Sequence, residues 1–122
     1  MVLIDTSVWI ALFRKKDHEV GQKMLSLIAG NQAAVCGQVW VEYLGGFRKE
    51  ALRKVHGAAL KHFPFLETGR GAFELAANWL ADHPPLGAGD AIIAATAMVN
   101  DAALLTLDKD FLPLQKLGLE LF

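Results

Sequence analysis

The chain has 122 residues, of which 53% are hydrophobic and 20% charged, and its formal net charge is −1. This length predicts one domain over residues 1–122, and the apolar content excludes a disordered chain. A single cysteine, Cys36, excludes an internal disulfide and a cysteine-rich zinc site, and it favours a reducing, cytoplasmic location. The apolar runs are shorter than the roughly 18 residues of a membrane helix, so no membrane association is expected.

Short β-branched or apolar runs alternate along the chain with segments whose apolar residues recur at helical spacing. In chain order, the predicted elements are a strand over residues 2–4, helices over 8–13 and 20–28, a strand over 33–36, helices over 38–48 and 52–62, an edge strand over 63–66, helices over 73–80 and 91–100, and strands over 103–107 and 117–121. This alternation predicts an α/β fold in which helices cover both faces of a mostly parallel sheet.

Two acids stand where strands of that sheet are expected to end. Asp5 directly follows the strand over residues 2–4, and Asp108 directly follows the strand over residues 103–107. Parallel strands end on the same side of a sheet, and binding sites form at that edge. We therefore expect Asp5 and Asp108 to face one crevice if their strands are neighbours.

Two further acids are expected near the same edge. Asp90 opens the helix that leads into the strand over residues 103–107, and Glu42 lies in the helix after the second strand. Carboxylates that are close together repel each other unless a cation offsets their charge. Mg²⁺ and Mn²⁺ prefer oxygen ligands, and such ions activate water and stabilise the leaving group of a phosphodiester. The four acids therefore predict the metal site of a phosphodiester hydrolase.

Four segments of the chain resemble the PIN-domain family, and in particular its VapC-type toxin nucleases from toxin–antitoxin pairs. They are VLIDTSVWIALF, VEYLGG around Glu42, LGAGDAIIAATA around Asp90, and LLTLDKDF near the end. The segments stand in the family's order and span nearly the whole chain. The resemblance implies one PIN-like nuclease domain: a three-layer α/β/α sandwich with a parallel five-stranded sheet in the order 3-2-1-4-5. It also implies Mg²⁺- or Mn²⁺-dependent endonuclease action on RNA, a small antitoxin partner and frequent dimerisation.

The resemblance assigns the acids one by one. Asp5, Glu42 and Asp90 fall on the family's first three acids. Asp108 matches the fourth acid in the form of the motif written T-x-D-x-D-F, and Asp110 is an alternative for that position.

Hydroxyl side chains beside the acids are candidates for supporting roles. We expect Thr6 and Thr106 to reach the waters of the metal or the phosphate. Tyr43 directly follows Glu42, where the family more often has a small residue, and we interpret it as a change in the groove wall.

Each of the acids also has a simple structural interpretation. Asp5 and Asp90 are typical of helix N-caps, Glu42 is typical of a solvated helix face, and Asp108 and Asp110 are typical of turns. A single shared metal ion accounts for all of them at once. The basic residues around 14–16 and 48–54 fit either an RNA groove or an ordinary solvated surface.

Three other classes of function are alternatives to the toxin ribonuclease. A non-catalytic PIN-like binding module would keep the same pocket to dock a protein or RNA without cleavage. A phosphorylated receiver-like domain needs an acidic pair where this chain has Asp5 and Thr6. A haloacid-dehalogenase-type phosphatase needs an aspartate at position 7, which is Ser7. The sequence therefore favours a metal-dependent endoribonuclease that acts as the toxin of a type II pair.

Overall fold

A parallel sheet of four short strands lies at the centre of the computed structural model, which describes residues 1–122. The strands stand in the order β3-β2-β1-β4. Leu3 of β1 lies opposite Ala34 of β2 and Leu104 of β4. Every residue of β1, β2 and β4 is buried, as expected for parallel strands covered on both faces. The strands are β1 (Val2–Ile4), β2 (Ala33–Cys36), β3 (Phe65–Leu66) and β4 (Ala103–Leu105).

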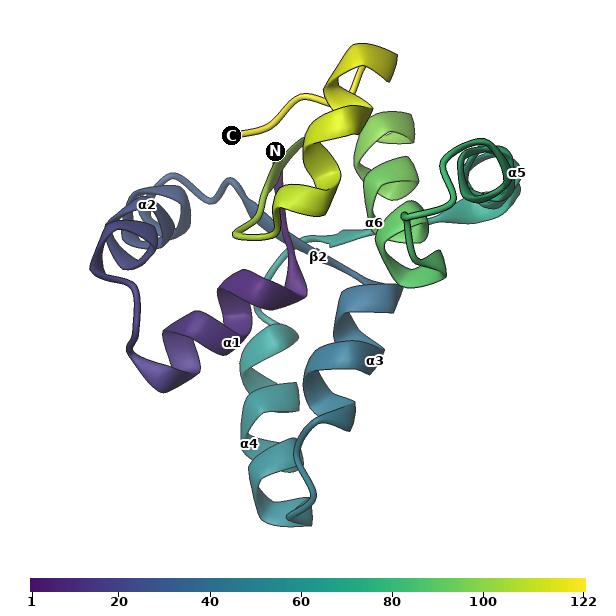
Figure 1. Cartoon of the computed structure of the whole chain (residues 1–122). Coiled ribbons are helices and arrows are strands. Elements are labelled where there is room, and N and C mark those ends of the chain that lie inside the picture. The colour runs from purple at the N-terminus through teal and green to yellow at the C-terminus, as the bar shows by residue number, and fades with distance from the viewer.

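Helices cover both faces of this sheet, which gives the predicted three-layer arrangement (Figure 1). On one face α2 (His18–Ala29) packs on β2 through a buried stripe that includes Val20 and Met24. On the other face α6 (Ala88–Val99) packs on β4, and α5 (Gly69–Asp82) packs against α6. None of the helices combines the length and the apolarity that crossing a bilayer would require.

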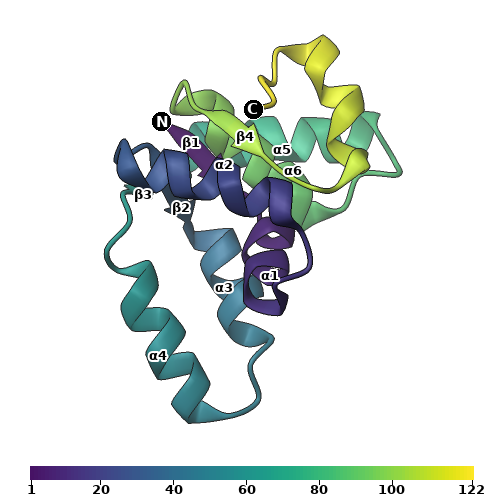
Figure 2. The same ribbon diagram turned by 90° about the vertical axis from the view of Figure 1, so that its left-hand side faces the viewer.

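Two further helices begin at the carboxyl ends of neighbouring strands and run side by side (Figures 1 and 2). α1 (Thr6–Arg14) follows β1, and α3 (Gly37–Gly45) follows β2 directly and packs against α1. α4 (Glu50–Leu60) packs on α3 and leads the chain back to β3. The short 3₁₀ helix η1 (Lys109–Leu117) follows β4 and contacts α6. The carboxyl edge of the sheet is therefore bordered by α1, α3, η1 and the start of α6.

The predicted α/β/α fold is confirmed, but the predicted fifth strand over residues 117–121 is wrong. η1 runs to Leu117, and Gly118 then turns the chain with a φ of 106°. Only Leu121 forms a bridge to Leu104, and it is parallel, so the terminus occupies the place of the fifth strand beside β4. The first four strands have the predicted order.

Two of the predicted elements that end earlier than expected carry or precede acids of interest. The helix predicted over residues 38–48 ends at Gly45, because two successive glycines lower the propensity of the chain to continue as a helix. The strand predicted over residues 103–107 ends at Leu105. The hydroxyl of Thr106 accepts from the backbone N–H of Asp108, at 2.9 Å, and this bond turns the chain out of the sheet. Thr106 and Leu107 therefore separate Asp108 from the end of β4, so Asp108 does not directly follow the strand.

Small residues let α6 lie close to the sheet. Its buried side consists mostly of alanines, together with Ile93 and Thr96. The buried Thr96 donates to the carbonyl of Ile92, at 2.7 Å, and pairs with the hydroxyl of Thr68, at 2.9 Å. No polar atom of Thr96 is therefore left without a partner. This close packing fixes the first turn of α6, which carries Asp90, at the carboxyl edge.

Candidate metal centre

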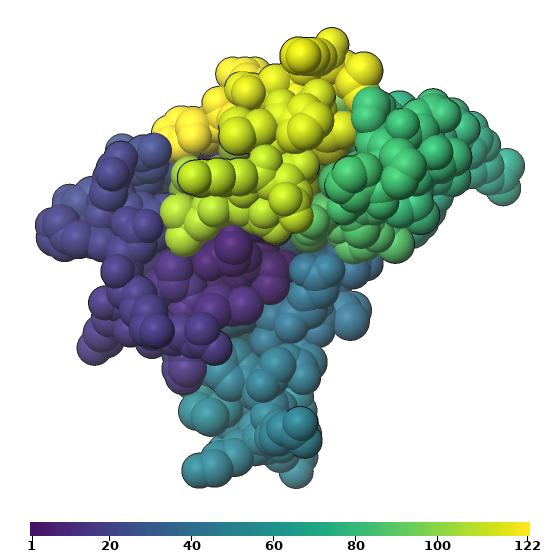
Figure 3. All heavy atoms as spheres, viewed as in Figure 1, coloured from purple at the N-terminus to yellow at the C-terminus, as the bar shows by residue number.

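The predicted acids come from segments that are far apart in the sequence and meet at the carboxyl edge of the sheet. Figure 3 shows these segments adjoining on one face, coloured purple, blue, green and yellow-green. The acids are Asp5 at the N-cap of α1, Glu42 in α3, Asp90 in the first turn of α6, Asp108 at the N-cap of η1 and Asp110 in its first turn.

Three of these acids form a group with the spacing of metal ligands. Asp90, Asp108 and Asp110 each offer a carboxylate oxygen, and these oxygens all lie within 4.8 Å of one another. The pKa of Asp90 is raised to about 6, first by burial and then by the negative charges of Asp108, Asp5, Glu42 and Asp110, in that order of effect. All four neighbouring carboxylates therefore act electrostatically on Asp90.

Asp5 is buried, with 3% of its surface exposed, and is held by hydroxyls. Its Oδ2 accepts from Ser7 Oγ at 2.6 Å and from Thr106 Oγ1 at 2.7 Å. Asp5 does occupy the N-cap position of α1, but its side chain caps no backbone N–H of that helix. The carboxylate is thus oriented by two hydroxyls that both bind one oxygen, which leaves Oδ1 available to a ligand.

Glu42 is half-buried and has a partner for each of its oxygens. Thr6 Oγ1 donates to Oε1 at 2.7 Å, and Gln38 Nε2 donates to Oε2 at 2.8 Å. Gly89 of α6 lies so close that a Cβ at this position would overlap Glu42 Oε2. The simple interpretation of Glu42 as a solvated helix residue does not describe this environment. Glu42 is a fixed negative charge held between α1, α3 and α6.

Asp108 and Asp110 form a turn and also belong to the acidic group. Asp108 Oδ1 accepts from the backbone N–H of Asp110 at 2.9 Å, which is the turn-forming role considered from the sequence. The backbone N–H of Asp108 in turn donates to Thr106 Oγ1. Thr106 therefore links Asp5 to Asp108, and both Asp108 and Asp110 remain within reach of Asp90.

Sequence reasoning missed three residues that shape the site: Ser7, Gln38 and Gly89. Helical spacing is a signal for Gln38, which precedes Glu42 by one turn, but Ser7 and Gly89 become visible only through contacts between distant segments. The roles expected for the threonine hydroxyls also differ. Thr6 and Thr106 donate to Glu42 and Asp5, so they position the acids themselves.

The donor set at this edge fits a hard divalent cation. Every candidate ligand is a carboxylate oxygen, and Mg²⁺ and Mn²⁺ select oxygen ligands. Four neighbouring acids contribute to the raised pKa of Asp90, and no acid of the group forms an ion pair with a basic side chain. Asp90, Asp108 and Asp110 would hold such an ion, with Asp5 and Glu42 adding negative charge around it.

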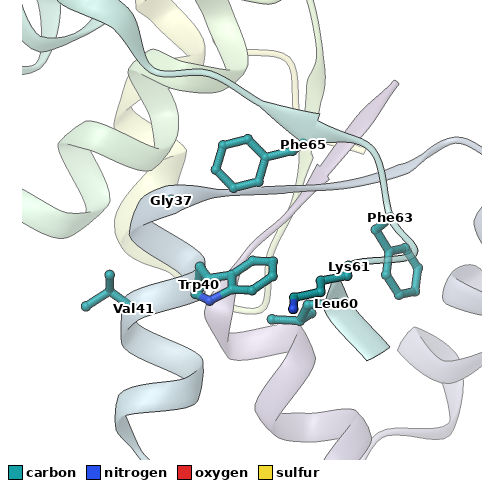
Figure 4. A pocket seen from close by; sticks show the side chains of 7 residues that line it. All are labelled: Gly37, Trp40, Val41, Leu60, Lys61, Phe63 and Phe65. Atoms are coloured by element: carbon teal, nitrogen blue, oxygen red, sulfur yellow. The ribbon is translucent and has the colours of Figure 1, made fainter. Parts of the chain in front are cut away.

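An apolar pocket lies apart from the acids, and none of the five lines it (Figure 4). It has a volume of about 510 Å³ and lies between α3, the end of α4 and β3. Trp40 and Phe65 meet there edge to face, with ring centroids 6.3 Å apart, and Phe63 and Leu60 complete the apolar wall. Lys61 is the only charged residue of the lining, and such a pocket suits an apolar partner.

Comparisons with known proteins agree with this arrangement. The PIN domain family matches residues 2–117. A toxin–antitoxin complex from Klebsiella pneumoniae contains a chain that is 28% identical over 91% of this chain and 90% of that chain, with a TM-score of 0.77. VapBC2 from Rickettsia felis, bound to a DNA fragment from its promoter, is 17% identical over 100% and 98%, with a TM-score of 0.79.

A further structure is described as the sarcin-ricin loop cleaving toxin VapC20 from Mycobacterium tuberculosis. It is 22% identical over 98% of this chain and 96% of that chain, with a TM-score of 0.72. At 17% and 22% identity, the likenesses to VapBC2 and VapC20 bear on the fold alone. No curated protein matches the sequence.

Proposed function

The chain belongs to the PIN domain family, and on that premise we propose that it is a divalent-metal-dependent endoribonuclease and the toxin of a toxin–antitoxin pair. The observation that carries the proposal is the gathering of Asp90, Asp108 and Asp110 within 4.8 Å, with the charges of Asp5 and Glu42 reaching Asp90.

The proposed reaction is the hydrolysis of an RNA phosphodiester. When bound, Mg²⁺ or Mn²⁺ supplies Lewis acidity that lowers the pKa of water and stabilises the departing oxygen. The chain's own part is to orient and to accept a proton: Ser7 and Thr106 fix Asp5, while Thr6 and Gln38 fix Glu42. A carboxylate of the group accepts a proton as water attacks phosphorus. The bond to the 3′-oxygen breaks, which leaves a 3′-hydroxyl and a 5′-phosphate.

Replacement of Asp5 by Asn tests this assignment. Asn keeps the shape of the side chain and an acceptor oxygen but removes the charge, so we expect the fold to be retained. Metal-dependent cleavage of RNA should fall by roughly 100-fold or more, as when a preorganised charge is removed from an active site. The matched control is Asp101→Asn, since Asp101 is exposed and lies at the opposite edge of the sheet, before β4. Equal cleavage by Asp5→Asn and the parent protein would overturn the assignment.

The proposal includes a small antitoxin protein as partner, and action in the cytoplasm. One of the similar structures, from Klebsiella pneumoniae, is by its description a toxin–antitoxin complex. The apolar pocket of Figure 4 offers this chain a surface for such a partner. Co-expression with the small protein encoded beside this chain should give a complex that does not cleave RNA. We also propose a homodimer, which light scattering of the purified chain tests.

The alternative, a non-catalytic PIN-like binding module, predicts a different result in the same assay. Such a module would bind RNA or protein and leave RNA intact at every metal concentration. Cleavage by the parent protein that stops on addition of EDTA would exclude it. The spacing of Asp90, Asp108 and Asp110 favours the enzyme, because it places three carboxylate oxygens where one divalent ion could bind.

A further inference from the structure

A narrow crevice between α1 and α3 opens beside the acidic group. It has a volume of about 180 Å³, and Glu42 forms part of its lining. The hydrogen bond between Thr6 and Glu42 joins the two helices at the acidic end. From there the crevice runs along α1 to Phe13 and Arg14, two helical turns further on. Any polymer that lies across the acids and follows the molecular surface between α1 and α3 would enter it.

An aromatic cluster forms the far wall of this crevice and is held in place from several sides. The ring of Phe47 stacks on His56, with centroids 4.5 Å apart and planes inclined by 7°. Phe13 meets both of these rings edge to face, each at 5.1 Å. The hydroxyl of Tyr43 and Nδ1 of His56 are 3.2 Å apart, and Arg53 donates to the carbonyl of Phe47. The wall is therefore built before any ligand arrives.

Two exposed side chains complete the crevice. Phe13 is 47% exposed although it is a large apolar residue. Arg14 is also exposed and makes no ion pair, since the ion pairs of the chain are Lys23 with Glu19 and Lys54 with Glu50. An exposed aromatic ring beside an unpaired guanidinium is the combination that binds single-stranded nucleic acid, in which bases stack on rings and phosphates bind cations.

On the basis of the proposed ribonuclease function, we propose that this crevice binds the nucleotide next to the scissile phosphate of a single-stranded RNA. Its base stacks against Phe13 and the aromatic wall, and Arg14 binds the phosphate that follows. Glu42 marks the boundary between this subsite and the acidic group. The crevice would thus select unpaired RNA, because a base within a duplex is not free to enter it.

The dimensions of the crevice favour a nucleotide over a protein segment. A helix that docks in a groove uses anchors at successive turns and needs an extended apolar surface. This crevice is small, and its lining includes the charged side chains of Glu42 and Arg14. The larger apolar pocket of Figure 4 is the better surface for a protein partner.

The test uses the full-length protein with Mn²⁺ and a random-sequence pool of single-stranded RNA oligomers. Phe13→Leu keeps an apolar side chain but removes the ring face, and Arg14→Gln removes the charge of an exposed residue. We expect each to raise KM by about tenfold with little change in kcat, because a stacked base or a bound phosphate contributes to binding of the substrate. Phe73→Leu and Arg70→Gln, on exposed positions of α5, are the matched controls and should resemble the parent protein.

The salt dependence of KM separates base stacking at Phe13 from phosphate binding at Arg14. A structural defect would not change this dependence in the same way. Arg14→Gln should reduce the slope of log KM against log salt concentration by about 0.7, the value for one phosphate contact on a single strand. Phe13→Leu should leave that slope unchanged. Should Phe13→Leu not fold, Arg14→Gln alone still decides the question.

Each outcome bears on one proposal or on both. If the parent protein cuts the pool and both variants match their controls in KM and salt slope, the subsite is wrong and the ribonuclease stands. If the variants cut RNA normally but no longer bind the antitoxin, the crevice holds a protein and the subsite is equally wrong. If the parent protein leaves the whole pool intact, the ribonuclease proposal fails and the subsite fails with it.

Discussion

Asp90 lies in the first turn of α6, where burial and four neighbouring carboxylates disfavour its charged form. The sequence predicted Asp5, Asp90 and Asp108 because each follows a predicted strand or begins a helix at the edge where such sheets bind ligands. It did not predict which side chains hold the acids, because the donors on Asp5 come from Ser7 nearby and from Thr106, which follows the distant strand β4. A residue's type can be read from sequence, but a hydrogen bond between distant segments requires the fold.

The raised pKa of Asp90 predicts that pH affects both the stability of the metal-free protein and its affinity for Mn²⁺. A carboxyl whose pKa is raised to about 6 by folding binds more protons in the native state than in the unfolded state between about pH 4 and pH 6. The metal-free protein should therefore lose stability as pH rises through this range, and Asp90→Asn should remove that loss. Mn²⁺ competes with the same proton, so its affinity should weaken as pH falls below 6.

Thermal melts of the metal-free protein and Mn²⁺ titrations at pH 5 and pH 7.5 measure these effects. Asp101→Asn is again the control, because Asp101 lies away from the acidic group. If the stability of the metal-free parent protein changes with pH in the same way as that of Asp90→Asn, the environment described for Asp90 is wrong.

Gly89 provides a second test at the residue scale. In Gly89→Ala the added Cβ would overlap Glu42 Oε2, so the carboxylate must move away from Gln38 and Thr6. The side chain is flexible, so we expect a cost in stability of only about 1 kcal/mol, the scale of a lost hydrogen bond. Cleavage should fall by up to ~100-fold, because a small displacement of a catalytic group has a large effect on rate.

The control for this substitution is Gly71→Ala, which lies in the first turn of α5 and meets open space. It should retain full cleavage activity and be at least as stable as the parent protein. If Gly89→Ala also retains full cleavage activity, cleavage does not depend on the present position of the Glu42 carboxylate.

At the scale of elements, the strands and helices of the first half were predicted well because their apolar patterns are unbroken. β1 and β2 have the predicted bounds, and α2 buries three of the apolar residues that recur at helical spacing, Val20, Met24 and Leu27, while the fourth, Ile28, is exposed. The end of the chain was predicted less well, because η1 extends to Leu117 and Gly118 turns the chain within the predicted strand over residues 117–121. Local propensity favoured a strand there, whereas the structure has a single bridge between Leu121 and Leu104.

Thr106 is the link between the sheet and the acids, and this link can be tested. Thr106→Val keeps the shape of the side chain but removes the hydroxyl that donates to Asp5 and accepts from Asp108. We expect a loss of about 1–3 kcal/mol in the free energy of unfolding, because polar groups of the site lose a partner. Metal affinity should fall as well, since Asp5 and Asp108 are no longer oriented together.

Thr68→Val is the matched control, because it removes a hydroxyl that pairs only with Thr96. Chemical denaturation measures stability, and calorimetric titration with Mn²⁺ measures affinity. Both variants should lose stability, but only Thr106→Val should lose metal affinity. An equal metal affinity in the two variants would show that Thr106 does not orient the site.

At the scale of the whole molecule, the parallel sheet brings four distant segments to one edge and thereby creates the acidic group. The α/β/α arrangement and the order of the four strands were predictable from alternating strands and helices together with the family resemblance. The crevice between α1 and α3 was not, because it depends on how the Phe13, Phe47 and His56 rings pack across three segments. A sequence pattern indicates which face of a helix is apolar but not the shape of the gap between two helices.

The most direct measurement of the central claim is a calorimetric titration of Mn²⁺ into the parent protein, Asp90→Asn and Asp101→Asn. If Asp90 and its neighbours share a cation, the parent protein and Asp101→Asn bind Mn²⁺ with the same affinity. Asp90→Asn should bind it at least about tenfold more weakly, which corresponds to about 1.4 kcal/mol. Equal affinities for all three proteins, or no binding by a parent protein that cleaves RNA, would contradict a shared metal centre at this edge of the sheet.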